Sequence, residues 1–263
     1  MRGTDMQPTI LEMTTWAKQA GKILMSGIGQ DIQIDHKSEI DLVTEMDRLS
    51  EAFLLDRIRE HYPDDRIVAE ESGIIQGNNG NVWHIDPLDG TINYAHGIPI
   101  FAVSLGYVQD GELNLGVVYD PVRNECYTAK RGQGAFLNGK RLHVSAADRL
   151  INSLLVTGFP YDIRARKDNN LDHYSNLSLQ SQGVRRLGSA ALDLCYIAAG
   201  RFDGFWEVEI QSYDIAAGAL VVEEAGGSVS DVHGGPDYLK PPCSILATNG
   251  QIHQAMLDAL WKA

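Results

Sequence analysis

Apolar residues recur every three or four positions along six stretches of the chain, and this spacing predicts amphipathic helices. The predicted helices cover residues 8–27, 44–61, 163–181, 189–199, 214–225 and 250–262. Thr44 precedes Asp47 by three residues, which resembles a capping box at the start of the second helix. Gly226-Gly227 follows the fifth helix, where glycine readily forms a left-handed C-cap. Both helix ends are therefore marked in the sequence itself.

Short runs rich in β-branched and aromatic residues predict strands between these helices. They lie near 66–69, 82–86, 101–108, 113–120, 124–129, 152–157, 203–208 and 243–248. The two central runs are joined through Asp110-Gly111, a pair that favours a tight hairpin turn. The glycine- and asparagine-rich stretch 73–81 is predicted to be a turn. Because helices and strands are mixed, with hairpins in the middle, we predict an α+β layered fold.

Composition places the chain among ordinary globular proteins. It has 263 residues, 44% of them hydrophobic and 22% charged, which is enough for one large domain or two small, closely packed ones. The 22 Lys and Arg against 35 Asp and Glu give a formal net charge of −13. Such an acidic chain is not expected to bind nucleic acid or an anionic membrane through its overall charge.

Localisation signals point to the cytoplasm. The chain has no apolar run of about 18 residues, and its first residues lack the apolar core of a secretion signal. Cys126, Cys195 and Cys243 are odd in number and far apart, and they form no CxxC pair. We therefore expect reduced cysteines in a cytoplasmic protein.

The segment from Trp83 to Tyr94 is the most informative for chemistry. A strand is expected to end at Asp86, because the following proline interrupts regular pairing. Asp89 follows three residues later, and two nearby carboxylates repel each other unless a cation or a proton lies between them. Gly90 and Thr91 then offer backbone amides to an anion at a possible helix start. The alternative is a turn that uses Asp and Gly only for their backbone preferences.

Further acidic residues lie where they could join this segment. Glu70 and Glu71 follow a predicted strand, and Asp214 lies near the start of a predicted helix. Asp41 and Asp47 flank the start of another helix. Each has an alternative role: adjacent acids often form a solvated surface, and an acid in a first helical turn stabilises that helix.

Taken together, these segments resemble the inositol monophosphatase family of Mg²⁺-dependent, Li⁺-sensitive phosphatases. Three blocks carry the resemblance: 41–47 with 70–73, 83–94, and 213–218 with 224–227. The resemblance covers nearly the whole chain. It implies a single domain over residues 1–263, made of two closely packed α/β lobes. The implied fold is the layered αβαβα sandwich of the inositol monophosphatase and fructose-1,6-bisphosphatase type, usually assembled as a homodimer.

The resemblance implies a site with two to three Mg²⁺ ions, for which Mn²⁺ is a possible substitute. One ion would be held by Glu70, Asp86 and the Leu88 carbonyl. A second would be held by Asp86, Asp89 and Asp214, and Glu70 would also contribute, through water, to a third and weaker ion. Carboxylates and carbonyls are the hard oxygen ligands that Mg²⁺ prefers.

The remaining roles also come from the resemblance. Thr91 and Asp47 would orient and deprotonate the attacking water, and the amides of Gly90 and Thr91 would hold the phosphate. Glu207 would hydrogen-bond substrate hydroxyls. The substrate pocket would also be lined by the helix start Gly188, Ser189 and Ala190, and Lys37, Asp41 and Glu71 would lie in a loop or behind the ligands. Arg185 and Arg186 either attract an anionic substrate or lie on the surface.

The expected function is hydrolysis of a small phosphorylated polyol, foremost myo-inositol 1-phosphate, to the polyol and phosphate. Fructose 1,6-bisphosphate, NADP and histidinol phosphate are alternative substrates, because they need only a different pocket around the same metals. A glycosidase using two of the carboxylates is a further alternative that predicts activity in EDTA. A non-catalytic binding protein on the same scaffold is another, and it predicts the loss of a metal ligand or of Thr91.

Overall fold

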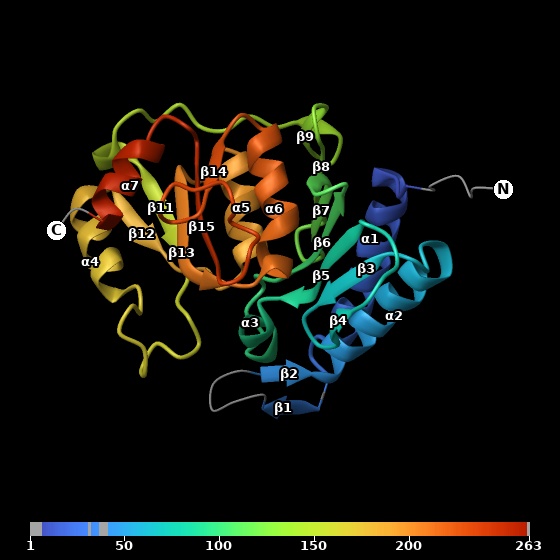
Figure 1. Cartoon of the computed structure of the whole chain (residues 1–263). Helices are drawn as coiled ribbons and strands as arrows, with labels where there is room; N and C mark the ends of the chain where they lie inside the picture. The colour runs from blue at the N-terminus through green and yellow to red at the C-terminus, as the bar shows by residue number, and fades with distance from the viewer. Residues whose placement is uncertain (1–6, 31–32, 37–41, 262–263) are drawn as a thin grey trace.

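The computed structural model describes residues 7–30, 33–36 and 42–261, arranged in five alternating layers of helices and sheets (Figure 1). Two helices cover one face of an eight-stranded sheet, two more lie between this sheet and a five-stranded sheet, and a last pair covers the outer face of the second sheet. The αβαβα sandwich expected from the sequence is therefore confirmed.

The outer layer beside the large sheet holds α1 (Ile10–Gly27) and α2 (Glu45–His61), and the short α3 (Thr91–Ala95) follows one strand of that sheet. The central layer holds α5 (Ala190–Ala198) and α6 (Ser212–Glu224). The far layer holds α4 (Leu171–Gln180) and α7 (His253–Trp261). A short 3-10 turn, η1, covers Leu150–Asn152.

The large sheet has the order β10-β9-β8-β7-β6-β5-β3-β4, and its pairs are antiparallel except β3 with β5. Its strands are β3 (Arg66–Ala69), β4 (Gly73–Ile75), β5 (Val82–Asp89), β6 (Ala102–Gln109), β7 (Glu112–Asp120), β8 (Glu125–Lys130), β9 (Gly134–Leu137) and β10 (Lys140–Arg141). The predicted hairpin joins β6 to β7, with Asp110 and Gly111 both at positive φ. Positive φ at both central residues is the geometry that a tight type I′ turn requires.

The small sheet has the order β12-β11-β13-β15-β14. Its strands are β11 (Leu154–Thr157), β12 (Gly183–Arg185), β13 (Gly204–Ile210), β14 (Ser228–Ser230) and β15 (Cys243–Thr248). A separate two-stranded ribbon pairs β1 (Ile34–His36) with β2 (Leu42–Thr44).

Three apolar clusters fill the spaces between the layers. The largest contains Val118 and Tyr127 of the large sheet, Leu220 of α6 and Ile245 of the small sheet, so it bridges both sheets. A second packs α1 and α2 on the large sheet, and a third packs α4 and α7 on the small sheet. Within the described residues, no helix combines the length and the apolar character needed to cross a bilayer.

The predicted helix 163–181 is shorter in the structure and begins only at Leu171. Asn170 has φ +70°, a left-handed conformation that ends helical geometry on its N-terminal side. Its buried side chain donates to Thr157 Oγ1 and the Gly158 carbonyl and accepts from the Trp206 indole. These tertiary bonds fix a conformation that the apolar spacing could not indicate.

Several short strands went unpredicted. β4 lies inside the stretch interpreted as a turn, and β9, β12 and β14 have only three or four residues each. Strands this short are stabilised by the sheets beside them, so their local sequence carries little signal.

Candidate functional site

A cavity of about 350 Å³ opens where the end of β5, the starts of α5 and α6, and β13 converge. These segments lie far apart in the sequence, and the two sheets bring them together. Eleven of the predicted site residues line this cavity: Glu70, Asp86, Leu88, Asp89, Gly90, Thr91, Gly188, Ser189, Ala190, Glu207 and Asp214. The predicted Lys37 and Asp41 lie outside the described residues.

The strand that carries Asp86 does not end there, contrary to prediction, but continues to Asp89. Asp86 pairs with Ser104 and Asp89 with Ala102, so two residues of β5 stand opposite one of β6. This extra residue is a bulge, and Pro87 fits it because proline lacks a backbone N–H. Side chains three residues apart in a regular strand point to opposite faces. The bulge shifts that alternation by one, so both carboxylates line the cavity.

Asp86 is buried beside other acids. One oxygen, Oδ1, accepts from the Leu88 amide at 2.9 Å. Burial raises the pKa of Asp86 well above its usual range, and the negative charges of Glu70, Asp89 and Asp214 raise it further. A cation in the cavity would reverse this repulsion.

Asp89 is buried as well, but the start of α5 surrounds it with donors. Oδ2 accepts from Ser189 Oγ at 2.5 Å and from the Ala191 amide at 2.8 Å, and Oδ1 accepts from the Ala190 amide at 3.2 Å. Burial raises the pKa of Asp89 to about 6, and these hydrogen bonds oppose a larger rise. The carboxylate thus ties β5 to α5 across 100 residues of sequence.

Asp214 occupies the third position of α6, where its Oδ2 accepts from the Gln211 amide at 3.0 Å. Burial, followed by the charges of Asp89 and Glu70, raises its pKa well above the usual range. The capping role expected as an alternative is therefore present, and the same carboxyl also lines the cavity.

Thr91 and Asp47 form a hydrogen-bonded pair at the start of α3. Thr91 Oγ1 lies 2.9 Å from Asp47 Oδ1 and 3.0 Å from the Leu88 carbonyl oxygen. The other oxygen of Asp47 closes the predicted capping box, accepting from the Thr44 amide at 2.8 Å and from Thr44 Oγ1 at 2.5 Å. One carboxylate therefore caps α2 and also orients the Thr91 hydroxyl.

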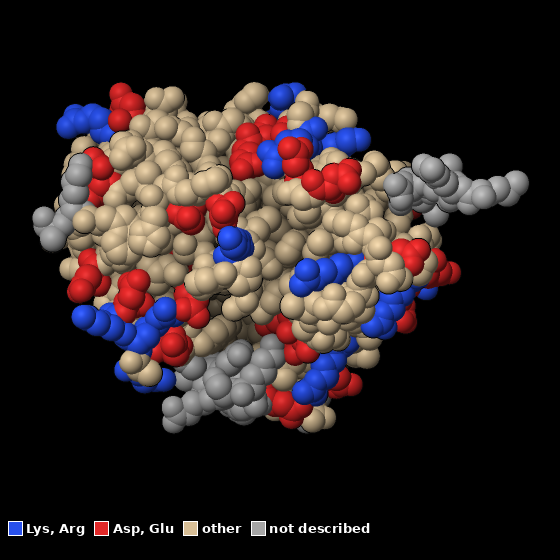
Figure 2. Space-filling view, in the orientation of Figure 1, with Lys and Arg blue, Asp and Glu red and all other residues tan. Residues whose placement is uncertain are grey.

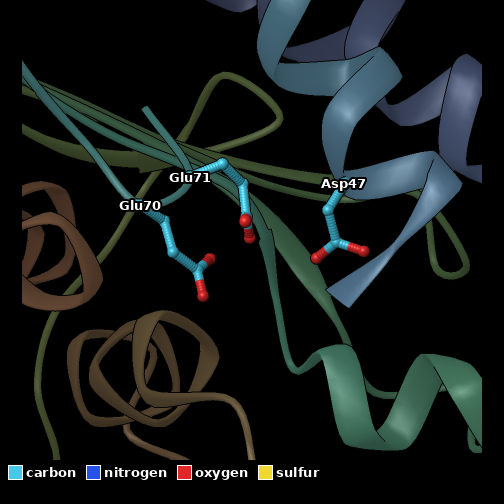
Figure 3. Close-up of side chains that lie close together, drawn as sticks. All are labelled: Asp47, Glu70 and Glu71. Carbon is cyan, nitrogen blue, oxygen red and sulfur yellow. The ribbon is translucent and has the colours of Figure 1, made fainter. Parts of the chain in front are cut away.

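Asp47, Glu70 and Glu71 form a close acidic cluster. One carboxylate oxygen from each lies within 4.8 Å of the others, and the three side chains converge on the gap between α2 and the end of β3 (Figure 3). The grouping differs from the predicted ligand sets, in which Asp47 was assigned to the attacking water and Glu71 to an outer position. It shows that Glu70 faces both this cluster and the cavity.

Glu51 holds the turn that carries Glu70 and Glu71, a role that the sequence analysis missed. Its buried carboxylate accepts from the amides of Glu71 at 2.8 Å and Ser72 at 2.9 Å, and from the Ser72 hydroxyl at 2.5 Å. Glu51 lies four residues after Asp47, on the same face of α2. That spacing was the available signal.

Two glycines line the cavity where α3 and the 187–188 loop approach each other. Gly90 has φ +96°, and a Cβ there would lie 2.9 Å from the Ile100 carbonyl oxygen. Gly188 has φ +85°, and its carbonyl and that of Leu187 accept from the Asn93 side chain at 3.3 and 2.8 Å. Asn93, another residue that was missed, thus holds the 187–188 loop against α3. Because α3 has only five residues, a bound anion would depend on individual amides instead of a long helix dipole.

Glu207 approaches the cavity from β13. Burial and the nearby Asp89 charge raise its pKa to about 8, and Arg186 opposes this shift. A Cβ at Gly158 would lie 1.7 Å from Glu207 Oε1, so only glycine leaves room for this carboxyl. Arg186 lines the cavity, whereas Arg185 does not. The sequence alone offered the same two alternatives for both arginines, and the structure distinguishes them.

The donor set fits a hard divalent cation. Four carboxyls and the Leu88 carbonyl supply only oxygen ligands. A positive ion among them would reduce the electrostatic repulsion between the buried carboxylates. The surface shown in Figure 2 has Lys and Arg interspersed with Asp and Glu, whereas in the cavity lining Arg186 stands among eight acids.

The fold and this site together define a member of the inositol monophosphatase family, and the chain belongs to it: the family model matches residues 5–263. Among its relatives is the Nus factor SuhB of Pseudomonas aeruginosa, 44% identical over 97% of this chain and 96% of that protein. The inositol-1-monophosphatase of Mesorhizobium japonicum is 42% identical over 95% of both chains. The solved structure of inositol monophosphatase from Anabaena has a TM-score of 0.87, with 43% identity over 97% of this chain and 98% of that one.

Proposed function

We propose that this protein is a Mg²⁺-dependent phosphomonoesterase that hydrolyses myo-inositol 1-phosphate or a similar polyol phosphate. One observation carries the proposal: the carboxyls of Glu70, Asp86, Asp89 and Asp214 share a cavity with Thr91. The Thr91 hydroxyl is hydrogen-bonded in turn to Asp47 behind the cavity lining. Membership in the inositol monophosphatase family supports the same chemistry. A glycosidase would need only two carboxylates, so it explains neither the number of acids nor the Thr91–Asp47 pair.

In this proposal Glu70, Asp86 and the Leu88 carbonyl hold one Mg²⁺, and Asp86, Asp89 and Asp214 hold another. Mg²⁺ supplies positive charge that stabilises the attacking and leaving oxygens of an in-line displacement at phosphorus. Asp86 is shared by both sets, and the repulsion from its acidic neighbours supports that position. Glu70 also faces Asp47 and Glu71, where a third, weaker ion would fit.

Thr91 and Asp47 would activate the attacking water. The Thr91 hydroxyl can donate to Asp47 Oδ1 and accept a hydrogen bond from water through its remaining lone pair. Asp47 is fixed by the capping box, so the pair is oriented before substrate binds. The oxygen that attacks phosphorus would thereby be aligned, and its proton would pass toward the Asp47 carboxylate.

The substrate would lie with its phosphate at Gly90 and Thr91 and its alcohol portion toward Gly188, Ser189, Ala190 and Glu207. Glu207 would accept hydrogen bonds from hydroxyls of the alcohol. Fructose 1,6-bisphosphate, NADP and histidinol phosphate are the alternative substrates, because the same ligand set would serve each.

The cellular setting belongs to the same proposal. We place the enzyme in the cytoplasm, which the buried free thiols of Cys126, Cys195 and Cys243 support. Assembly as a homodimer, inhibition by Li⁺ and replacement of Mg²⁺ by Mn²⁺ are proposed from the family resemblance. The relatives' names divide between Nus factor SuhB and inositol-1-monophosphatase, so the phosphatase proposal rests on the cavity residues.

The test measures phosphate release from myo-inositol 1-phosphate, fructose 1,6-bisphosphate, NADP and histidinol phosphate, each with Mg²⁺ and with EDTA. We expect release only with Mg²⁺ and fastest from the inositol ester. Release that persists in EDTA, or no release from any of the four, would contradict the proposal. A faster reaction with one of the alternatives would retain the mechanism and change the substrate.

A further inference from the structure

Asp193 is a buried carboxyl on the wall of the cavity that none of the roles above uses. It lies in the first turn of α5 and is only 1% exposed. Every other residue of α5 is apolar or aromatic, so Asp193 is an exception in a helix buried between two sheets. Yet it lines the cavity together with Glu207, Arg186 and Ser189.

One oxygen of this carboxyl lacks a partner. Oδ1 of Asp193 is buried and accepts no hydrogen bond from any described residue. Buried polar atoms in folded proteins nearly always have a partner, and leaving one without costs the desolvation of that group. The other cavity carboxyls show the contrast, because Asp89 alone accepts three hydrogen bonds. A buried acceptor without a partner, on a residue that lines the cavity, fits a donor that arrives with a ligand.

The surroundings of Asp193 indicate what kind of donor this is. Glu207 and Asp89 are close enough for their charges to act on it, and Arg186 opposes them. A second phosphate on the substrate would bring acceptor oxygens to Asp193 and not a donor. A hydroxyl donates a hydrogen bond without bringing an anion, and a polyol carries several. The position, on the same wall as Glu207, corresponds to the alcohol portion and not to the phosphate.

We propose that Asp193 is a specificity-determining residue that accepts a hydrogen bond from a hydroxyl group of the substrate's alcohol portion. The inference rests on the proposed phosphatase function. It extends that function by giving Asp193 a role in recognising a leaving group with several hydroxyls. Glu207 and Asp193 then bind different hydroxyls from β13 and α5. An alcohol of the same ring size without hydroxyls would gain nothing from Asp193.

The experiment compares myo-inositol 1-phosphate with cyclohexyl phosphate, which has the same six-membered saturated ring without hydroxyls. Both are assayed with Mg²⁺ in the wild type, Asp193→Asn and Asp193→Leu. Leucine keeps a similar shape without any acceptor, and asparagine keeps one acceptor oxygen. We expect Asp193→Leu to raise the KM for the inositol ester about tenfold to a hundredfold, with a smaller rise for Asp193→Asn. The kinetics of cyclohexyl phosphate should be unchanged within about twofold.

Thermal unfolding separates ligand recognition from a structural role. An acid in a first helical turn also stabilises its helix, and Asp172 occupies the first turn of α4 on the surface, outside the cavity. Asp172→Asn is therefore the matched control, with wild-type kinetics expected for both substrates. The Tm of Asp193→Leu should not fall below that of the wild type by more than about 2 °C, because the substitution removes an unpaired buried polar atom.

Each other outcome has a definite meaning. Equal losses for both substrates together with a lower Tm would overturn the proposal in favour of a structural role. Unchanged kinetics for the inositol ester would overturn it as well. If the wild type cleaves cyclohexyl phosphate but not the inositol ester, the polyol assignment is wrong and the phosphatase function stands. If it cleaves neither, the polyol assignment is wrong, and release from fructose 1,6-bisphosphate, NADP or histidinol phosphate then decides whether the phosphatase function stands.

Discussion

Asp86 and Asp89 lie three residues apart, in the same strand and on the same cavity wall, yet their surroundings differ sharply. Asp89 accepts hydrogen bonds from Ser189 and from the first amides of α5. Asp86 accepts one backbone hydrogen bond, from the Leu88 amide, and its other neighbours are the acids Glu70, to which it is hydrogen-bonded, Asp89 and Asp214. The protein itself supplies several donors to Asp89, whereas it surrounds Asp86 with other acids.

Asp86 and Asp89 belong to one sequence motif, but their different surroundings give them different roles. Asp89 joins the two halves of the fold, because its hydrogen bonds connect β5 of the large sheet to α5 of the central layer. Asp86 concentrates charge that the fold does not neutralise. Burying like charges lowers the stability of the folded protein, and a positive ion that binds between them raises it again. The comparison predicts that the two residues respond oppositely to the same substitution.

The largest expected effect is the loss of activity in Asp86→Asn. The amide keeps the shape and can still accept from the Leu88 amide, but it weakens both proposed Mg²⁺ sites at once. We expect less than about one tenth of the wild-type kcat/KM for inositol 1-phosphate at saturating Mg²⁺. Higher retained activity would contradict the shared position of Asp86. Asp172→Asn, on the exposed first turn of α4 and outside the cavity lining, is the control for the effect of charge removal.

A smaller effect should appear in stability, measured as Tm in EDTA. Asp86→Asn removes a repelling charge, so its Tm should equal or exceed that of the wild type. Asp89→Asn puts an amide N–H₂ group where Ser189 and the Ala191 amide donate, and it weakens the tie to α5. We expect its Tm to fall by about 2–6 °C, from the usual cost of losing a helix cap. Shifts of the same sign in both variants would refute the comparison.

The sequence predicts the local and the chemical features of this molecule well. The capping box at Thr44 and Asp47, the Asp110-Gly111 hairpin and the Gly226 helix end depend on neighbouring residues, and all are present. Four acids from the three sequence blocks, Glu70, Asp86, Asp89 and Asp214, line one cavity together with seven other predicted positions.

The features that went unpredicted depend on partners distant in the sequence. The helix start at Leu171 depends on Asn170 bonding to Trp206, and the extra residue beside Pro87 appears only when β5 pairs with β6. Glu51 and Asn93 act through backbone groups that other elements bring to them. No spacing within one segment encodes such contacts, although the position of Glu51 four residues after Asp47 was a usable hint.

The smallest expected effect, and the most direct view of the cavity's charge, is the pH dependence of Tm in EDTA. A carboxyl whose pKa is raised by folding binds more protons in the folded state, so stability falls as pH rises toward the folded pKa. Glu207, with a pKa of about 8, acts this way, and Asp86 and Asp214 shift in the same direction. Buried His84 has its pKa lowered from 6.5 to about 4. It therefore makes stability rise with pH between about 4 and 6.5, against the effect of the acids, and it does not affect the slope above pH 6.5. Between pH 6.5 and 8 the acids therefore act unopposed by His84, and Tm in EDTA should decrease.

Two additions make this prediction specific to the cavity. Glu207→Gln should flatten the decrease, because the amide does not titrate, while leaving the proposed Mg²⁺ ligands intact. Saturating Mg²⁺ should raise Tm, and the gain over EDTA should grow with pH, since the ion competes with protons for the same carboxylates. A Tm in EDTA that rises over this range, or a gain from Mg²⁺ that shrinks with pH, would mean that the acids of the cavity are already neutralised by the protein. In that case Asp86 would resemble Asp89, and the distinction between the two carboxylates would not hold.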